Sequence, residues 1–181
     1  MSVFEACARK LADALNKSGL DYALTGALAA SFYGVPRTTA DIDIIVAVPD
    51  RDAKDKLASA LKQAGLEVDE KKINDALTSG YTIVTFKSKT SPLTVDIIVS
   101  GNIKKRSGPI AGVNTFFQAP EDLILAKLRM IKATVPRERT LKDEEDIKAI
   151  LRFSEVDAEA VEKQAAKDKT LTIWKTLTKK S

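Results

Sequence analysis

Hydrophobic residues near the start of the chain change from helical to strand spacing and back again. Apolar side chains recur every three or four positions in residues 3–17 and stop before Gly19, which predicts a helix with a glycine cap. Residues 20–25 form a short apolar run typical of a strand, and the alanine-rich residues 26–33 predict a helix that begins at Gly26. The first elements are therefore predicted as helix, strand, tight turn and helix.

Runs of β-branched residues predict the strands in the middle of the chain. These runs cover residues 41–48, 81–88 and 93–99. An amphipathic pattern over residues 51–64 predicts a helix after the first of these strands. Residues 101–108 are expected to form a basic loop, and residues 112–117 an edge strand. The pattern predicts a mixed α and β fold.

The last third of the chain is predicted to be mostly helical. Pro120 begins a strongly apolar helix that runs to about residue 133. Two acids in its first turn interact favourably with the positive end of the helix dipole. The helical pattern resumes at residue 141 and continues to near the end. Because Pro136 makes the sharpest break, we expect a core at residues 1–134 and a helical portion at residues 135–181, packed together as one structural domain.

The composition excludes several kinds of active site, because histidine is absent and Cys7 is the one cysteine. The chain cannot build a Ser-His-Asp or Cys-His nucleophile system, a zinc site with His or thiolate ligands, or an iron–sulfur cluster. Catalysis would rest on carboxylates, Lys or Arg, hydroxyls and hard metal ions. No apolar run is long enough to span a bilayer and the start lacks a secretory signal, so we expect a cytoplasmic protein without membrane contact.

The formal net charge of +4 is concentrated in a basic tail, residues 169–181. The rest of the chain is neutral. A basic chain end is consistent with a solvated terminus and with nucleic-acid contact. Aromatic residues make up 6% of the chain and are not interleaved with the basic runs, which gives a nucleic-acid-binding module little support.

Three aspartates stand out in otherwise apolar predicted strands. Strand alternation puts Asp41 and Asp43 on one face, about 6.6 Å apart, with isoleucines on the other face. Asp96 is the one charged residue of residues 93–99, and charges in such runs are rarely buried unpaired. If the two strands are neighbours, the three acids can converge on a Mg²⁺ ion. The alternative is that the acids face water or pair with Arg37 or a lysine.

Gly26 lies between a predicted strand and a predicted helix. A glycine there permits a tight turn, and the helix N-terminus that follows offers backbone N–H groups to an anion. Arg37 and Thr38, just before the acidic strand, would add a guanidinium group and a hydroxyl for phosphate oxygens. Such a glycine can also serve a purely steric purpose, so the anion site is one of two interpretations.

Lys127 has apolar neighbours three and four positions away on its predicted helix. Its ammonium group needs a partner, and there are two kinds of candidate: a triphosphate, or the acids Asp143 and Asp146 of the next helix. The alternative is that the side chain reaches solvent along its own stem.

The ordered set of these motifs resembles the polymerase-β-like nucleotidyltransferase superfamily. The similarity covers roughly residues 20–151 and is closest to the branch of the abortive-infection nucleotidyltransferase toxins and their uncharacterised relatives. It rests on Gly26-Ala27, residues 37–45, Val95-Asp96-Ile97, Pro120 to Lys127 and Lys142 to Ile147. The resemblance implies an α/β (α+β) minimal nucleotidyltransferase core, with a mixed sheet flanked by helices and a helical C-terminal portion.

The resemblance also implies which residues act. Asp41 and Asp43 would bind metal, Asp96 would be the third carboxylate, and Gly26 with Ala27 would lie near the nucleotide phosphates. The family commonly has Gly-Ser or Gly-Gly where this chain has Gly26-Ala27, so here a backbone N–H is present without a side-chain hydroxyl.

The implied reaction is transfer of a nucleoside monophosphate from a nucleoside triphosphate such as ATP to an acceptor hydroxyl, with Mg²⁺ or Mn²⁺. The acceptor could be an RNA end, a protein or a small molecule, and an antitoxin or other partner protein could accompany a toxin component. The alternative is a catalytically weak or inactive nucleotide-binding or regulatory protein of the same fold, which the missing hydroxyl at Ala27 favours.

Overall fold

A computed structural model describes residues 1–35, 38–79 and 83–179 of the chain. Contacts between residues group the chain into two compact units. The first, called here the sheet unit, comprises residues 1–28 and 38–118, and the second, the helical unit, comprises residues 29–37 and 119–181. This grouping puts residues 120–133 with the later helices. The division at residues 134 and 135 stays a prediction.

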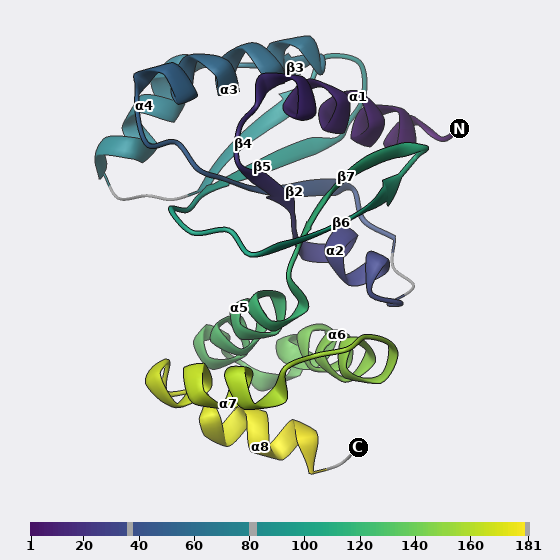
Figure 1. Cartoon of the computed structure of the whole chain (residues 1–181), viewed down its shortest axis with the longest axis vertical. Helices are drawn as coiled ribbons and strands as arrows, with labels where there is room; N and C mark the ends of the chain where they lie inside the picture. The colour runs from purple at the N-terminus through teal and green to yellow at the C-terminus, as the bar shows by residue number, and fades with distance from the viewer. Residues whose placement is uncertain (36–37, 80–82, 180–181) are drawn as a thin grey trace. The chain divides into compact units, whose positions relative to one another are not determined.

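One mixed sheet runs through the sheet unit (Figure 1). Its described strands are β1 (Tyr22–Leu24), β2 (Asp41–Val46), β3 (Leu66–Glu67), β4 (Ile83–Ser88), β5 (Thr94–Val99), β6 (Lys105–Ile110) and β7 (Val113–Gln118). They are ordered β3-β4-β5-β2-β1-β7-β6. The pairs β2/β5 and β1/β7 are parallel, and the other neighbours are antiparallel. The predicted mixed sheet flanked by helices is confirmed.

The described helices of the sheet unit cover one face of this sheet. They include α1 (Val3–Ser18), α3 (Arg51–Gln63) and α4 (Glu70–Ser79), and α1 and α3 lie side by side (Figure 1). Ser2 starts α1 with a reciprocal capping box to Glu5. Ile42 and Ile44 of β2 are fully buried, whereas the residues that alternate with them, Asp41 and Asp43, point to the opposite face. Core packing of the isoleucines therefore determines where the acids point.

The predicted edge strand and basic loop are both wrong in detail. Residues 113–118 form β7, which pairs on both sides, with β1 and with β6. Half of the expected loop at residues 101–108 belongs to β6, at the end of the sheet. Ala111 and Gly112 both have positive φ and form the two-residue turn that pairs Ile110 with Val113. This turn brings β6 onto β7 although Gly and Pro within β6 disfavour a strand.

The helical unit is built from α5 (Pro120–Ala133), a 3₁₀ turn (Arg137–Thr140), α6 (Leu141–Phe153), α7 (Ala158–Lys167) and α8 (Leu171–Thr178), with α2 (Gly26–Phe32) crossing from the sheet unit. The predicted helices at residues 120–133 and beyond 141 are therefore present, the second as three separate helices. None of the described helices is both long and apolar enough to cross a membrane.

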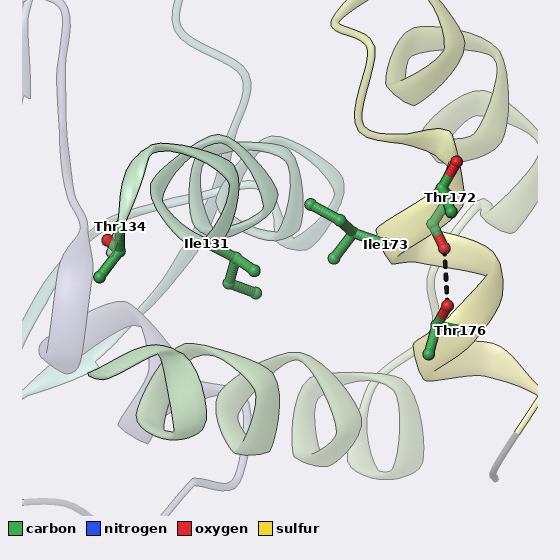
Figure 2. Close-up of a pocket in the computed structure, with 5 residues that line it drawn as sticks. All are labelled: Ile131, Thr134, Thr172, Ile173 and Thr176. Atoms are coloured by element: carbon green, nitrogen blue, oxygen red, sulfur yellow. Dashed lines mark hydrogen bonds between the residues drawn. The ribbon is translucent and has the colours of Figure 1, made fainter. Parts of the chain in front are cut away.

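A pocket of about 270 Å³ lies between α5 and α8 of the helical unit (Figure 2). It is lined by Ile131, Thr134, Thr172, Ile173 and Thr176. The hydroxyls of Thr134 and Thr176 donate to carbonyls of their own helices, at 2.7 and 2.9 Å. No charged side chain lines this pocket, which makes it unsuited to a triphosphate.

Candidate metal and nucleotide site

Asp41, Asp43 and Asp96 meet on the face of the sheet opposite the buried isoleucines. β2 and β5 are adjacent and parallel, and their register puts Asp43 directly beside Asp96. One carboxylate oxygen from each aspartate lies within 4.8 Å of the others. Asp43 and Asp96 are half-buried. The structure thus brings together the three acids that the sequence singled out.

Threonine hydroxyls contact the two outer acids of this cluster. Thr85 Oγ1, on β4, donates to Oδ1 of Asp96 at 2.6 Å, and Thr39 Oγ1 donates to Oδ1 of Asp41. The alternative in which an aspartate pairs with Arg37 falls outside the described residues. Each of these hydrogen bonds restricts the rotation of a carboxylate that has close negative neighbours.

Gly26 makes room for Asp43. Its φ of +57° is a conformation that L side chains rarely adopt, and a Cβ added here would lie 2.0 Å from Asp43 Oδ2. The backbone holds the two residues together, because the N–H of Thr25 donates to the carbonyl oxygen of Asp43 at 2.9 Å. The steric interpretation of this glycine is therefore supported. The contact with Asp43 could not be found from sequence, because it depends on how β1 pairs with β2.

Replacing Gly26 with alanine should destabilise the chain and displace the Asp43 carboxylate. The positive φ alone costs about 1–3 kcal/mol for a residue with a Cβ, and the clash adds to this. Thermal unfolding in chelator measures the stability loss. The matched control is Gly65→Ala, where φ is +87° but nothing lies within 4 Å of an added Cβ. Equal destabilisation of the two variants would contradict the steric argument.

The other predicted phosphate contacts are Ala27, Thr38 and Arg37. Ala27 lies in the first turn of α2, a helix of seven residues, and is half-buried. Thr38 is exposed. Arg37 lies outside the described residues. Their role at the phosphates stays a prediction.

Lys127 is buried in the helical unit, with 7% of its surface exposed. Its Nζ lies 3.0 Å from Asp143 Oδ1 and 2.6 Å from Asp146 Oδ2, both on α6. The expected partners on the next helix are confirmed, and the alternative in which Lys127 reaches solvent is wrong. Asp146 is 2% exposed, so this is an ion pair in the core of the unit.

A pocket of about 380 Å³ in the sheet unit has Thr85 among its lining residues. It lies between α4 and the start of β4 and is lined by Lys72, Asp75, Ala76, Ser79, Ile83, Val84 and Thr85. Among the described residues, β3 pairs with Lys87 and Ser88 at the end of β4. Helix α4 also contacts β4. Thr85 belongs to both the pocket wall and the hydrogen bond to Asp96. Sequence reasoning missed this pocket because it did not predict α4.

The chain also matches a known protein family. Residues 9–176 match the family described as nucleotidyl transferase AbiEii toxin, Type IV TA system. The chain belongs to this family. The predicted branch of the polymerase-β-like superfamily is confirmed, and the chain is a nucleotidyltransferase. No curated protein matches it in sequence.

Solved structures of other nucleotidyltransferases share the fold of this family member. An antigenic nucleotidyltransferase-like protein from Paracoccidioides brasiliensis is 20% identical over 84% of this chain and 78% of its own, with a TM-score of 0.56. The antibiotic-resistance factor ANT(2'')-Ia is 15% identical over 97% and 94%, with a TM-score of 0.65. The crystal structure of ANT(2")-Ia in complex with adenylyl-2"-tobramycin is 14% identical to this chain. The match covers 93% of this chain and 98% of the other, with a TM-score of 0.66. At these identities the likeness shows the fold alone.

The acid cluster of this nucleotidyltransferase fits a divalent metal ion. Its three carboxylates offer oxygen ligands, the kind that Mg²⁺ and Mn²⁺ prefer. Sulfur and imidazole ligands play no part, since histidine is absent and Cys7 is buried in α1. Burial raises the pKa of the Cys7 thiol, which disfavours the thiolate form, although Lys10 acts in the opposite direction.

Proposed function

We propose that the chain transfers a nucleoside monophosphate from a nucleoside triphosphate to an acceptor hydroxyl and releases pyrophosphate, with Mg²⁺ or Mn²⁺ as the cofactor. The convergence of Asp41, Asp43 and Asp96 within 4.8 Å carries this proposal. Three carboxylates this close repel one another, and a divalent ion offsets that repulsion. The family to which the chain belongs supports the reaction class.

Each residue of the site has a proposed part in this reaction. Asp41, Asp43 and Asp96 would hold the metal ion. When bound there, such an ion would neutralise triphosphate charge and lower the pKa of the acceptor hydroxyl. Asp96 would accept the proton that this hydroxyl loses.

The triphosphate would be bound by groups around the acids. We assign the backbone of Gly26 and Ala27, the guanidinium of Arg37 and the hydroxyl of Thr38 to phosphate oxygens. Lys127 stays a proposed contact of the triphosphate through its ammonium group, whose charge is also shared with Asp143 and Asp146. Its ion pair with Asp143 and Asp146 supplies a fixed position for the ammonium group within the helical unit.

The acceptor hydroxyl would belong to an RNA end, a protein or a small molecule, and the chain would act as the toxin component of a toxin–antitoxin pair. The family description supports the toxin assignment and implies an antitoxin. Incubation with each labelled nucleoside triphosphate and Mg²⁺ in total cell extract tests the proposal, because the labelled molecule identifies the acceptor class. Absence of label transfer with every triphosphate would contradict it.

A catalytically weak nucleotide-binding protein of the same fold is the second candidate. Ala27 favours it, since alanine lacks the hydroxyl that the family commonly places beside the phosphates. The acid cluster favours the enzyme, because three mutually repelling carboxylates serve no purpose in a protein that has lost its metal.

Divalent metal and triphosphate should bind together more tightly than either alone. The carboxylates need the ion to offset their repulsion, and Mg²⁺ fills its coordination shell with phosphate oxygens. Calorimetry with Mg²⁺, with the triphosphate and with both measures this coupling. Equal triphosphate affinity with and without Mg²⁺ would exclude the acid cluster as the site.

A further inference from the structure

Thr85 lies directly opposite Asp96 on the neighbouring strand. The antiparallel register of β4 and β5 pairs these two residues. The hydroxyl O–H of Thr85 donates to Oδ1 of Asp96, with 2.6 Å between the oxygens, a short hydrogen bond to a carboxylate. Such a bond limits the side-chain torsions of the carboxylate that receives it. Thr85 therefore acts on the orientation of Asp96.

Repulsion between the carboxylates favours orientations of the Asp96 side chain that point away from the cluster. The Asp96 carboxylate lies close to those of Asp41 and Asp43, and like charges at this distance repel. A carboxylate has two oxygens, so a hydrogen bond from Thr85 to one of them leaves the other available to the metal.

We propose that Thr85 is a positioning residue, whose hydroxyl holds Asp96 in the orientation that completes the metal site. This inference rests on the proposed function, because it assigns Thr85 to the metal site described there. Hydrogen-bond partners of ligating carboxylates commonly set ligand orientation, and their removal typically lowers metal affinity or activity about 10- to 100-fold.

A purely structural role for Thr85 makes a different prediction. Threonine is a good strand residue because it is β-branched, and valine has the same shape and an equal or better strand propensity. If Thr85 served only the sheet, valine would replace it without consequence for metal binding. The hydroxyl matters only if its hydrogen bond to Asp96 matters.

The test compares Thr85→Val, Thr85→Ser and the parent, each as the full chain. Mn²⁺ binding is measured by electron paramagnetic resonance of the unbound ion, and melting in chelator monitors the fold. We expect Thr85→Val to raise the Mn²⁺ dissociation constant about 10-fold or more and to melt near the parent temperature. Thr85→Ser keeps the hydroxyl and should restore most of the affinity. The matched control is Thr94→Val, which makes the same change on β5, on the face that carries Asp96.

Asp43→Asn, measured in parallel, separates this inference from the proposed function. If Asp43→Asn loses Mn²⁺ binding while Thr85→Val binds Mn²⁺ like the parent, the metal site stands and the role of Thr85 is overturned. If the parent binds no Mn²⁺, or Asp43→Asn binds it unchanged, the proposed metal site fails and the role of Thr85 fails with it. Loss of affinity in Thr85→Ser equal to that in Thr85→Val would also overturn the inference.

Discussion

Replacing Asp43 with asparagine should abolish nucleotidyl transfer and raise the melting temperature of the metal-free protein. Asp43 shares a strand face with Asp41 and is the register partner of Asp96, so it is the central acid of the cluster. Two like charges at this separation repel by about 1 kcal/mol even in water. Removing one charge therefore stabilises the metal-free state. For a chain of this size, each kcal/mol corresponds to about 2–4 °C in melting temperature.

The same substitution should remove the stabilisation that Mg²⁺ with triphosphate gives the parent. Mass action puts that stabilisation at about 2.7 kcal/mol when the ligand is at a hundredfold excess over its dissociation constant. Transfer should fall by more than about 100-fold, beyond the range typical for loss of an outer-shell partner, because a proposed metal ligand is lost. Thermal melts in chelator and in Mg²⁺ with triphosphate, together with a transfer assay, measure all three effects.

Glu67→Gln is the matched control for Asp43→Asn. It makes the same carboxylate-to-amide change on β3, an edge strand three positions from β2 in the sheet, and should alter neither ligand stabilisation nor transfer. If Asp43→Asn lowers the melting temperature in chelator and keeps the ligand stabilisation, Asp43 is an ordinary surface acid. That result would overturn the metal site.

The acid cluster could be predicted from sequence because its geometry follows from strand alternation. Buried Ile42 and Ile44 force Asp41 and Asp43 to one face, and the same rule places Asp96 on β5. Adjacency of β2 and β5 was a condition of that prediction, and the structure meets it. What could not be predicted is the register, and with it the contacts of Thr85 and Gly26, because pairing depends on turns and packing far along the chain.

The missed elements have weak local signals. Helix α4 has two buried apolar residues, Ile73 and Ala76, among mostly polar ones, so its helical pattern is faint. Strand β6 contains Gly108 and Pro109, both unfavourable within strands, and it forms at the end of the sheet, where proline is tolerated. Tertiary pairing with β7 outweighed the local preference of these residues.

Lys127→Met should lower the free energy of unfolding by about 3–5 kcal/mol, the usual cost of leaving a buried charge without its ion-pair partner. Lys127 is 7% exposed, and its removal leaves Asp146, which is 2% exposed, without that ion pair. Asp143 is less affected because its side chain is 27% exposed and can be hydrated. The exposed Lys148 of α6 offers the matched control, and Lys148→Met should change stability by less than about 0.5 kcal/mol.

The double variant Lys127→Met/Asp146→Leu should recover most of the lost stability. Replacing both partners of a buried ion pair with apolar residues of similar volume is often neutral or stabilising, whereas removing one partner is not. Urea unfolding of the two single variants and the double variant measures this coupling. Additive effects would show that Lys127 and Asp146 do not depend on each other.

Because the double variant should fold, it also separates the structural role of Lys127 from its proposed role at the triphosphate. If the ammonium group contacts phosphate, the double variant should bind Mg²⁺ with triphosphate more weakly than the parent, although its stability is restored. The control is Asp146→Leu alone, which keeps the lysine and its contact with Asp143. Triphosphate affinity equal to the parent's in the stable double variant would remove Lys127 from the nucleotide site and leave it as a core ion pair.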